Sequence, residues 1–378
     1  MYKIGVISAV IFLSLLVPNK FFEIYYGIVG LLFLITGLGY FRLRKIHLFI
    51  FIYAAVLLTT RTVLWNTISD LKELIKITFM LISLLFLKGF RDILNTKYVY
   101  YSIGFFSFLN FIVSVLLVFR LSGSLESFIL EYYTAESQRI LYTFSSIRST
   151  GLSSGVGQQG LISLMLLVYF METIKENRFG YFFTSITIIT LLFSQSKTSI
   201  AISLVYIFFL LRKNFIVITL GISTIVFLIK KYFDLLKTLF REIFQLFTGG
   251  ELSSFDGRIS NWMNLILPMI ENPLSLFFGL GRGYYESRKM ASSVYDSDFI
   301  YVIVNFGLIG LTIYLFHITQ LMSELVWRRK IALLLILCSG FTLNPIFEPK
   351  LFIVFNILTL TLSRVSYGKN YLDSNKLP

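Results

Sequence analysis

Two carboxylates stand at the start of a long apolar run. They are Asp296 and Asp298, in the stretch YDSDFIYVIVNFGLIG (residues 295–310). A carboxylate in this position can accept a proton from a hydroxyl group. An acid at a helix N-terminus can equally stabilise the helix, by about 0.3 to 1 kcal/mol. The residue types therefore leave a chemical and a structural role open for both acids.

Cationic side chains stand in four other polar stretches. The cations are Arg148 in RSTGLSSGVGQQG (148–160), Lys197 in SQSKTS (194–199), Arg258 in FDGRISNW (255–262), and Arg282 and Arg288 in FGLGRGYYESRKM (278–290). Arginine binds diphosphate oxygens in a bidentate fashion, and lysine can serve an anionic ligand as a point charge. Each cation also has an ordinary structural interpretation, as a lipid anchor, a snorkelling lysine or a local ion-pair partner.

Several chemistries have no residues to carry them. His47 and His317 fall near the inner ends of predicted spans, so no histidine base is expected on the outer face. The single cysteine, Cys338, lies inside an apolar run, which rules out an internal disulfide or a cysteine metal cluster. The G-x-G-x-G of residues 279–283 has no preceding strand. It therefore favours a tight turn that faces backbone N–H groups and an arginine toward an anion, and not a dinucleotide site.

The elements that must position these residues are membrane helices. The chain has 378 residues, of which 56% are hydrophobic, 17% aromatic and 14% charged. Apolar runs of membrane-spanning length recur from end to end, and in lipid only helices satisfy their own backbone without closing a barrel. We therefore predict an all-α polytopic membrane protein, a single integral membrane domain over residues 1–378 with about twelve transmembrane helices. The predicted spans lie near residues 4–18, 22–40, 46–60, 76–90, 98–118, 156–174, 180–195, 198–211, 214–230, 299–317, 331–345 and 351–364.

The short links between the spans indicate the orientation. Five basic links fall on one side if the N-terminus is cytoplasmic, and the positive-inside rule makes that side the cytoplasm. These links are 41–45, 88–97, 175–180, 210–214 and 327–330. Both termini are then cytoplasmic. The net charge of +14 is explained by this topology, so we expect no nucleic-acid binding.

Three longer loops are expected on the outer face, at about 61–75, 119–155 and 231–297. The last is the large loop between spans nine and ten. It begins with the amphipathic stretch 230–247, which we expect to lie flat on the outer membrane surface. Further polar candidates on this face are Arg139, Gln159, Tyr295 and Glu348. Cations that bind a diphosphate, beside a carboxylate that accepts a proton from a sugar hydroxyl, would suit glycosyl transfer from a lipid diphosphate.

The ordered set of polar stretches resembles Wzy-type O-antigen polymerases and their relatives, the O-antigen ligases. RSTGLSSGVGQQG is similar to the family's Arg-x-x-Gly segment, and SQSKTS is similar to its Ser-Arg motif with Lys197 in the arginine position. GRISNW followed by ENPLSLFFGLGRG (271–283) is similar to the Gly-Arg-x-x-x-Trp and Asn-Pro-Leu segment. DSDFIYVIVNFGLIG (296–310) is similar to the Asp-containing segment that opens the following span. The resemblance covers roughly residues 140–310.

The resemblance implies a GT-C-like helical fold and a glycosyltransferase that needs no cofactor or metal. The expected enzyme joins undecaprenyl-diphosphate-linked repeat units on the outer face of the bacterial inner membrane, with inversion at the anomeric carbon. Asp296 would be the base, and Arg258 and Arg148 would act on the leaving diphosphate. Arg288, Lys197, Arg282 and Arg139 would bind the diphosphate, and Asp298, Gln159, Glu348 and Tyr295 would support the site. A separate chain-length regulator and membrane lipids are the expected partners.

Two alternatives stay open from the sequence. O-antigen ligases carry histidine where this chain has Asp296, which favours the polymerase over the ligase. A polysaccharide-lipid flippase or other transporter would carry charges buried in mid-span and helices broken by glycine or proline.

Lys197 in place of arginine keeps the charge but loses the planar fork that bidentate binding needs.

Overall fold

The computed structural model describes residues 2–16, 18, 22–37, 39–40, 45–65, 68–94, 96–134, 148–173, 179–211, 253–288, 297–323, 325, 327–341, 343 and 348–374. Within these ranges every regular element is a helix, and no strand occurs. The prediction of an all-α fold is therefore confirmed for the part of the chain that the structure describes.

Eleven of the twelve predicted spans coincide with helices, and the twelfth, 214–230, lies outside the described residues. The helices are α1 (Tyr2–Leu16), α2 (Phe22–Gly37), α3 (Lys45–Trp65), α4 (Ser69–Gly89), α6 (Lys97–Phe119), α9 (Val156–Thr173), α10 (Gly180–Ser194), α11 (Lys197–Leu211), α18 (Asp298–Ser323), α19 (Trp327–Cys338) and α20 (Pro349–Ser374). Shorter helices are α5 (Arg91–Leu94), α7 (Gly123–Tyr132), α15 (Ser253–Ile270), α16 (Pro273–Phe278) and α17 (Arg282–Ser287), and a 3₁₀ turn covers Ser339–Phe341.

Three of these helices are long and apolar enough to cross a membrane. They are α6, α18 and the part of α3 from His47 to Trp65. Several others, including α1, α10 and α11, are equally apolar but shorter. A membrane protein is thus plausible from helix length and composition, while the number of spans and the orientation stay predictions.

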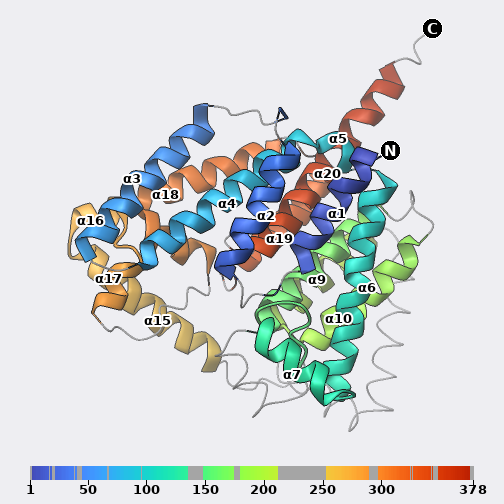
Figure 1. Ribbon diagram of the computed structural model, residues 1–378, viewed down its shortest axis with the longest axis horizontal. Helices are drawn as coiled ribbons and strands as arrows, with labels where there is room; N and C mark the ends of the chain where they lie inside the picture. Colours follow the sequence, from blue (N-terminus) through green and yellow to red (C-terminus); the bar gives the residue numbers. More distant parts are fainter. Residues whose placement is uncertain are drawn as a thin grey trace.

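Helix α20 lies at the centre of the bundle (Figure 1). Its residues from Pro349 to Leu362 are all buried, and it packs against α4 on one side and α9 on the other. Helices α2 and α3 pack against α4, while α10 packs against α9 and α6, and α1 against α6. The central helix therefore joins two helical groups that carry different parts of the candidate site.

The helix ends beside the predicted basic links lie together. The rings of Tyr40 and Phe90 are 4.9 Å apart, which joins the first two links. Near the other three links, Tyr206 donates a hydrogen bond to Glu172 at 2.9 Å, and Arg329 lies 3.6 Å from the same carboxylate. Both termini and α5 lie toward one side of the molecule, and α7 lies toward the other (Figure 1). Helix ends beside the first two links are therefore close to each other, as are helix ends beside the other three, while a common side for all five links and its orientation stay predictions.

The predicted outer loop 61–75 is wrong. Helix α3 continues to Trp65 and α4 already begins at Ser69. Asp70 and Glu73 fall within the predicted loop, but both side chains are buried and have partners on other elements. Because these charges are compensated inside the protein, the helix can extend through them.

Helix α18 is also not the continuous span predicted at 299–317. Gly307 has φ +63°, and the chain bends there into two helical pieces. The bend places Tyr314 of the second piece against the first turn: its hydroxyl lies 3.4 Å from Asp298, and its ring centroid lies 5.9 Å from that of Phe299. Glycine permits this left-handed backbone conformation without a steric penalty.

Candidate functional site

The break in α18 leaves backbone carbonyls without helical donors, and groups from other elements satisfy them. The Gly281 amide donates to the Val304 carbonyl at 2.9 Å. Arg61 Nη1 donates to the Asn305 carbonyl at 2.6 Å, and the Tyr53 hydroxyl donates to the Phe306 carbonyl at 3.0 Å. Non-helical backbone inside a bilayer is tolerated only where protein or water satisfies it. The break is therefore stabilised by its own set of hydrogen-bond donors.

The turn between α16 and α17 packs directly onto this break. Gly279 and Gly281 have φ values of +77° and +80°. A Cβ atom on Gly279 would lie 2.6 Å from the Val304 carbonyl oxygen, and one on Gly281 would lie 2.6 Å from Asp70 Oδ1. The G-x-G-x-G stretch thus forms the predicted tight turn, and its glycines allow the close approach of two backbones.

The amides of this turn do face an anion, and that anion belongs to the protein. The backbone N–H groups of Arg282 and Gly283 donate to the two carboxylate oxygens of Asp70, at 3.1 and 3.2 Å. Asp70 is fully buried, and it lies in the first turn of α4, ahead of the predicted span 76–90. Burial raises the pKa of this carboxyl, while Arg61 and the two amides act in the opposite direction. Asp70 therefore caps the N-terminus of α17.

Arg282 is part of a charge-balanced network. Its Nε lies 2.9 Å from Glu286 and its Nη1 lies 3.7 Å from Glu73. Glu286 also accepts a hydrogen bond from Ser69, and Lys76 lies 3.3 Å from Glu73. Together with Arg61 and Asp70 the network holds three positive and three negative side chains. The Arg282 charge is consequently engaged by two carboxylates of the protein.

Arg288 stands outside that network. It follows the last residue of α17 and is exposed, with its guanidinium 4.3 Å from the centre of the Tyr284 ring. Tyr284 in turn packs edge-on against Trp65, with ring centroids 5.2 Å apart. The aromatic support holds the cation at the rim of the charged network, where an anionic ligand can reach it.

The segment 148–160 folds into the protein beside α10 and α20. The Ser149 amide donates to the Phe193 carbonyl at 2.9 Å, and the Leu152 amide donates to Asn110 Oδ1 at 2.9 Å. Lys350, which is 1% exposed, donates from Nζ to the Leu152 carbonyl at 2.9 Å. Buried backbone in this segment is therefore held by an amide side chain and by one buried cation.

The predicted candidates near this segment divide by exposure. Gln159 is fully buried, with its Nε2 3.4 Å from the Ser114 hydroxyl, so it supports the segment from inside. Arg148 and Lys197 are half-buried, at the entry to the segment and at the start of α11. A Cβ on Gly160 would contact Ser196, which places the 148–160 and 194–199 stretches against each other. The structure thus brings the two predicted motifs together.

The start of α18 lies next to the same segment. The Asp298 amide donates to the Leu343 carbonyl at 3.3 Å, and a Cβ on Gly157 would lie 2.8 Å from the Leu343 side chain. Asp298 is fully buried, and α18 begins at this residue. Its carboxylate lies beside the Tyr314 hydroxyl, so a supporting role suits it better than direct contact with a substrate.

Glu348 stands just before α20 and connects the two halves of the site. Its Oε2 accepts the Leu351 amide at 2.9 Å. Burial raises the pKa of this carboxyl, while the Leu351 amide, Lys350 and Lys76 act to lower it. Glu348 therefore holds the N-terminus of the central helix between the Lys350 and Lys76 charges.

Several predicted candidates have no described side chain. Asp296, Tyr295 and Arg139 lie outside the described residues, and so does the amphipathic stretch 230–247. Arg258 lies on α15, and its side chain is also outside the described set. The prediction of Asp296 as base and of Arg258 as a diphosphate ligand therefore stays a prediction.

Six residues that organise this end of the protein were not among the predicted candidates. They are Arg61, Asp70, Glu73, Lys76, Tyr301 and Lys350. The available signal was an ionisable residue at the edge of an apolar run, which marks a functional or structural site by default. Tyr301, which donates to Glu73, carried no such signal.

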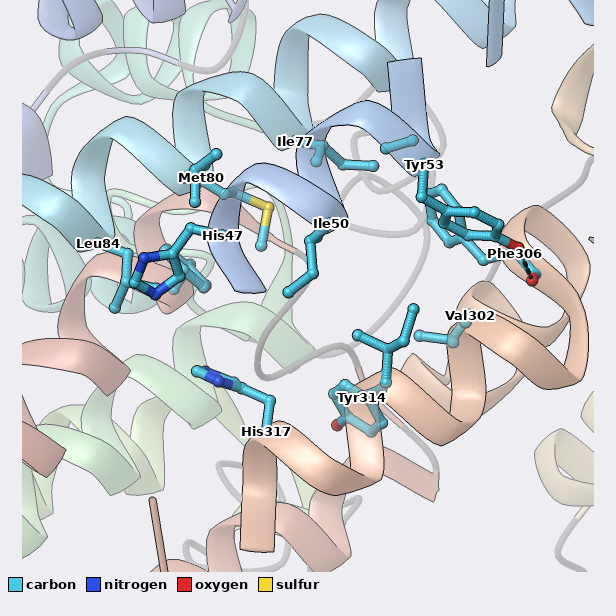
Figure 2. Close-up of a pocket in the computed structure, with 15 residues that line it drawn as sticks. His47, Ile50, Tyr53, Ile77, Met80, Leu84, Val302, Phe306, Tyr314 and His317 are labelled. Carbon is cyan, nitrogen blue, oxygen red and sulfur yellow. Dashed lines mark hydrogen bonds between the residues drawn. The ribbon is translucent and has the colours of Figure 1, made fainter. Parts of the chain in front are cut away.

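An apolar cavity of about 160 Å³ lies beside the α18 break, between α3, α4, α18 and α20. Tyr53 and Phe306 lie at one end of it, and His47 and His317 lie at the other (Figure 2). Most of the remaining lining is aliphatic, including Ile50, Met80 and Val302. The cavity has the lining of a site for an apolar chain.

Comparison with protein-family models, with curated proteins and with solved structures found no match for this chain. Among the described residues, no group of three or more histidine, cysteine, aspartate or glutamate side chains could hold a metal ion.

Proposed function

We propose that this protein is a membrane glycosyltransferase that polymerises a surface polysaccharide from undecaprenyl-diphosphate-linked repeat units. The proposal rests on the sequence resemblance to Wzy-type polymerases and on the way the described motifs meet. The proposal also includes that the protein lies in the bacterial inner membrane and that its site faces outward.

The supporting observation is the convergence of stretches that are far apart in the sequence. Segment 148–160 contacts 194–199 through Gly160 and Ser196, and it reaches the start of α18 through Leu343. The turn that leads to Arg282 and Arg288 binds the same α18 through Gly281 and Val304. These contacts bring segments 148–160 and 194–199 and the turn before α17 to the same helix or its neighbours, which supports the proposal for the stretches that the structure describes.

In the proposed reaction the hydroxyl oxygen of the acceptor sugar attacks the anomeric carbon of the donor. A new glycosidic bond forms as the bond from that carbon to the diphosphate oxygen breaks, and the diphosphate leaves with the electron pair. The hydroxyl proton passes to the Asp296 carboxylate. Arg148, Arg258 and Arg288, with Lys197 in support, stabilise the charge that develops on the diphosphate. The apolar cavity beside α18 has a lining suited to part of a carrier-lipid chain.

The exposed Arg288 is a stronger candidate for diphosphate binding than Arg282. Glu73 and Glu286 already neutralise Arg282, so a diphosphate would have to displace a carboxylate there. Arg288 rests on an aromatic face and keeps its guanidinium at the surface. We therefore assign Arg282 mainly to the support of α17.

A transporter is the second candidate, because one observation favours it. Helix α18 is broken at Gly307, and discontinuous helices are typical of substrate sites in transporters. The two proposals differ in their product: a polymerase lengthens the glycan on the carrier lipid, and a transporter moves the lipid-linked glycan unchanged.

The test uses purified protein in vesicles with undecaprenyl-diphosphate-linked repeat units as the only glycan substrate, with EDTA present. We expect a ladder of polymer on the carrier lipid, and a rate at least roughly 100-fold lower for Asp296→Asn. The matched control is Glu271→Gln, because Glu271 is an exposed acid on the same loop.

Each alternative has its own result. An unchanged rate in Asp296→Asn would remove this residue from the base role. Product only after addition of a separate lipid acceptor would indicate a ligase. Transfer of the lipid-linked unit across the vesicle membrane without any polymer would indicate a transporter.

A further inference from the structure

We infer that Arg61 and Asp70 form a buried clamp that fixes the turn of residues 278–283 and thereby sets the position of Arg288. These are positioning residues, since neither is exposed to a ligand: Arg61 is 5% exposed and Asp70 is fully buried. The inference about Arg288 rests on the proposed function, and the existence of the clamp does not.

The guanidinium of Arg61 connects the break in α18 to the end of α16. Its Nη1 donates to the Asn305 carbonyl at 2.6 Å, at the break in α18. Its Nη2 donates to the Gly279 carbonyl at 2.6 Å and also to the Phe278 carbonyl, at the end of α16. The planar fork of arginine can serve several acceptors in this way, and an ammonium on a flexible stem cannot reproduce that geometry.

Asp70 holds the other side of the same turn. Its two carboxylate oxygens accept the first two amides of α17. Gly281 lies between the two side chains: a Cβ there would meet Asp70 Oδ1 at 2.6 Å and Arg61 Cδ at 2.8 Å. The turn is thus enclosed by one cation that binds its carbonyls and one anion that binds its amides.

The clamp acts on Arg288 through a short, rigid element. Helix α17 has six residues, and Arg288 follows directly at its C-terminus. Tyr285 donates from its hydroxyl to the Leu265 carbonyl, and Tyr284 packs against Trp65, so α17 cannot rotate freely about its N-terminus. Fixing residues 278–283 therefore fixes the exposed guanidinium of Arg288, five residues later in the chain.

Hydrogen exchange on the purified full-length protein tests the clamp directly. In Asp70→Ala we expect the peptide that contains Arg282 and Gly283 to exchange roughly tenfold faster, because two hydrogen bonds are lost. Peptides from α9 and α20 should exchange as in the wild type. Asp70→Asn, which keeps one acceptor oxygen and the side-chain shape, should give an intermediate rate, and Glu271→Gln should give no change.

Binding of undecaprenyl diphosphate in detergent tests the positioning role on the same samples. We expect the affinity to fall roughly tenfold in Asp70→Ala and to recover partly in Asp70→Asn, in step with the amide protection. Unchanged amide protection in Asp70→Ala would overturn the clamp. Lost protection with wild-type affinity would overturn the positioning role. A wild-type protein that binds no undecaprenyl diphosphate would contradict the proposed function, and with it the ligand role of Arg288, while the exchange rates would still decide the clamp.

Discussion

Among the described residues, two segments that contain non-helical backbone, at 148–155 and at 279–281, enter this helical bundle, and they are held in different ways. Segment 148–160 is held largely by neutral groups, such as Asn110, and by one cation, Lys350, that binds a single carbonyl. The turn 278–283 is held by Arg61, which binds two of its carbonyls and one carbonyl at the α18 break, and by Asp70, which binds two amides. The same problem, buried backbone without helical partners, is thus solved once with few charges and once with many.

The difference indicates where rigidity is concentrated. Charge-assisted hydrogen bonds are roughly twice as strong as neutral ones, and removal of one partner leaves the other charge buried and uncompensated. We therefore expect the 278–283 turn and the α18 break to be the less tolerant region. Segment 148–160 should accept substitutions with smaller losses of stability.

A large expected effect follows from substitution at the helix break. Gly307→Ala should destabilise the protein by roughly 2–5 kcal/mol, because a side chain must adopt a positive φ and its Cβ would overlap the Phe277 carbonyl. Thermal unfolding in detergent measures the loss. Gly27→Ala is the control, since nothing lies within 4 Å of its Cβ position, and alanine should be neutral or stabilising there. Similar unfolding temperatures for both variants would contradict the described break.

A pair of substitutions compares the two buried cations. Arg61→Met should cost about 3–5 kcal/mol, because it leaves three carbonyls without their donor and removes the positive charge beside the buried Asp70 carboxylate. Lys350→Met removes one hydrogen bond to Leu152 and the charge beside Glu348, which keeps the Leu351 amide as a partner, and it should cost about 1–3 kcal/mol. Denaturation of both variants in the same detergent gives the order. An equal or larger loss for Lys350→Met would reverse the comparison.

The acid beside Lys350 predicts a dependence on pH. Burial raises the pKa of Glu348 above its ordinary value of 4.5, so the folded state binds a proton more tightly than the unfolded state. The contribution of Glu348 to stability is therefore largest at acidic pH and declines as the pH rises above about 4.5. The unfolding temperature of the wild type minus that of Glu348→Gln should fall from pH 4 toward neutrality. A difference that grows with pH would show that the Lys350 and Lys76 charges dominate instead.

The smallest expected effect on stability is at the exposed cation. Arg288→Ala removes a contact with the Tyr284 ring and should change the free energy of unfolding by less than about 1 kcal/mol. Its unfolding temperature should match that of Lys72→Ala, another exposed cation on the protein. A loss as large as that of Arg61→Met would place Arg288 in the structural network.

The positions of the helices could be predicted from the sequence, and so could part of the arrangement of the motifs. Apolar runs predicted the helices because helix length in a membrane is set by the run itself. Glycines at 279 and 281 predicted a tight turn, which the structure contains. The basic links also predicted which helix ends lie together, as the Arg329–Glu172 contact illustrates.

The side chains that hold the candidate site in place could not be predicted from the sequence. Gly307 in an apolar run looks like any membrane-helix glycine, because the break depends on donors that arrive from α3 and from the 278–283 turn. Arg61 and Asp70 appeared to belong to a loop because charge marks the end of a span. Their burial depends on partners more than 200 residues away along the chain, and no local pattern encodes such contacts.

The most direct test of the account measures polymer formation by wild-type, Arg288→Ala and Lys72→Ala proteins under identical conditions. The substrate is the undecaprenyl-diphosphate-linked repeat unit in vesicles, and all three proteins are first shown to unfold at similar temperatures. We expect polymer from the wild type and from Lys72→Ala, and a kcat/KM at least roughly 100-fold lower for Arg288→Ala. No polymer from the wild type, or equal rates for all three proteins, would contradict it.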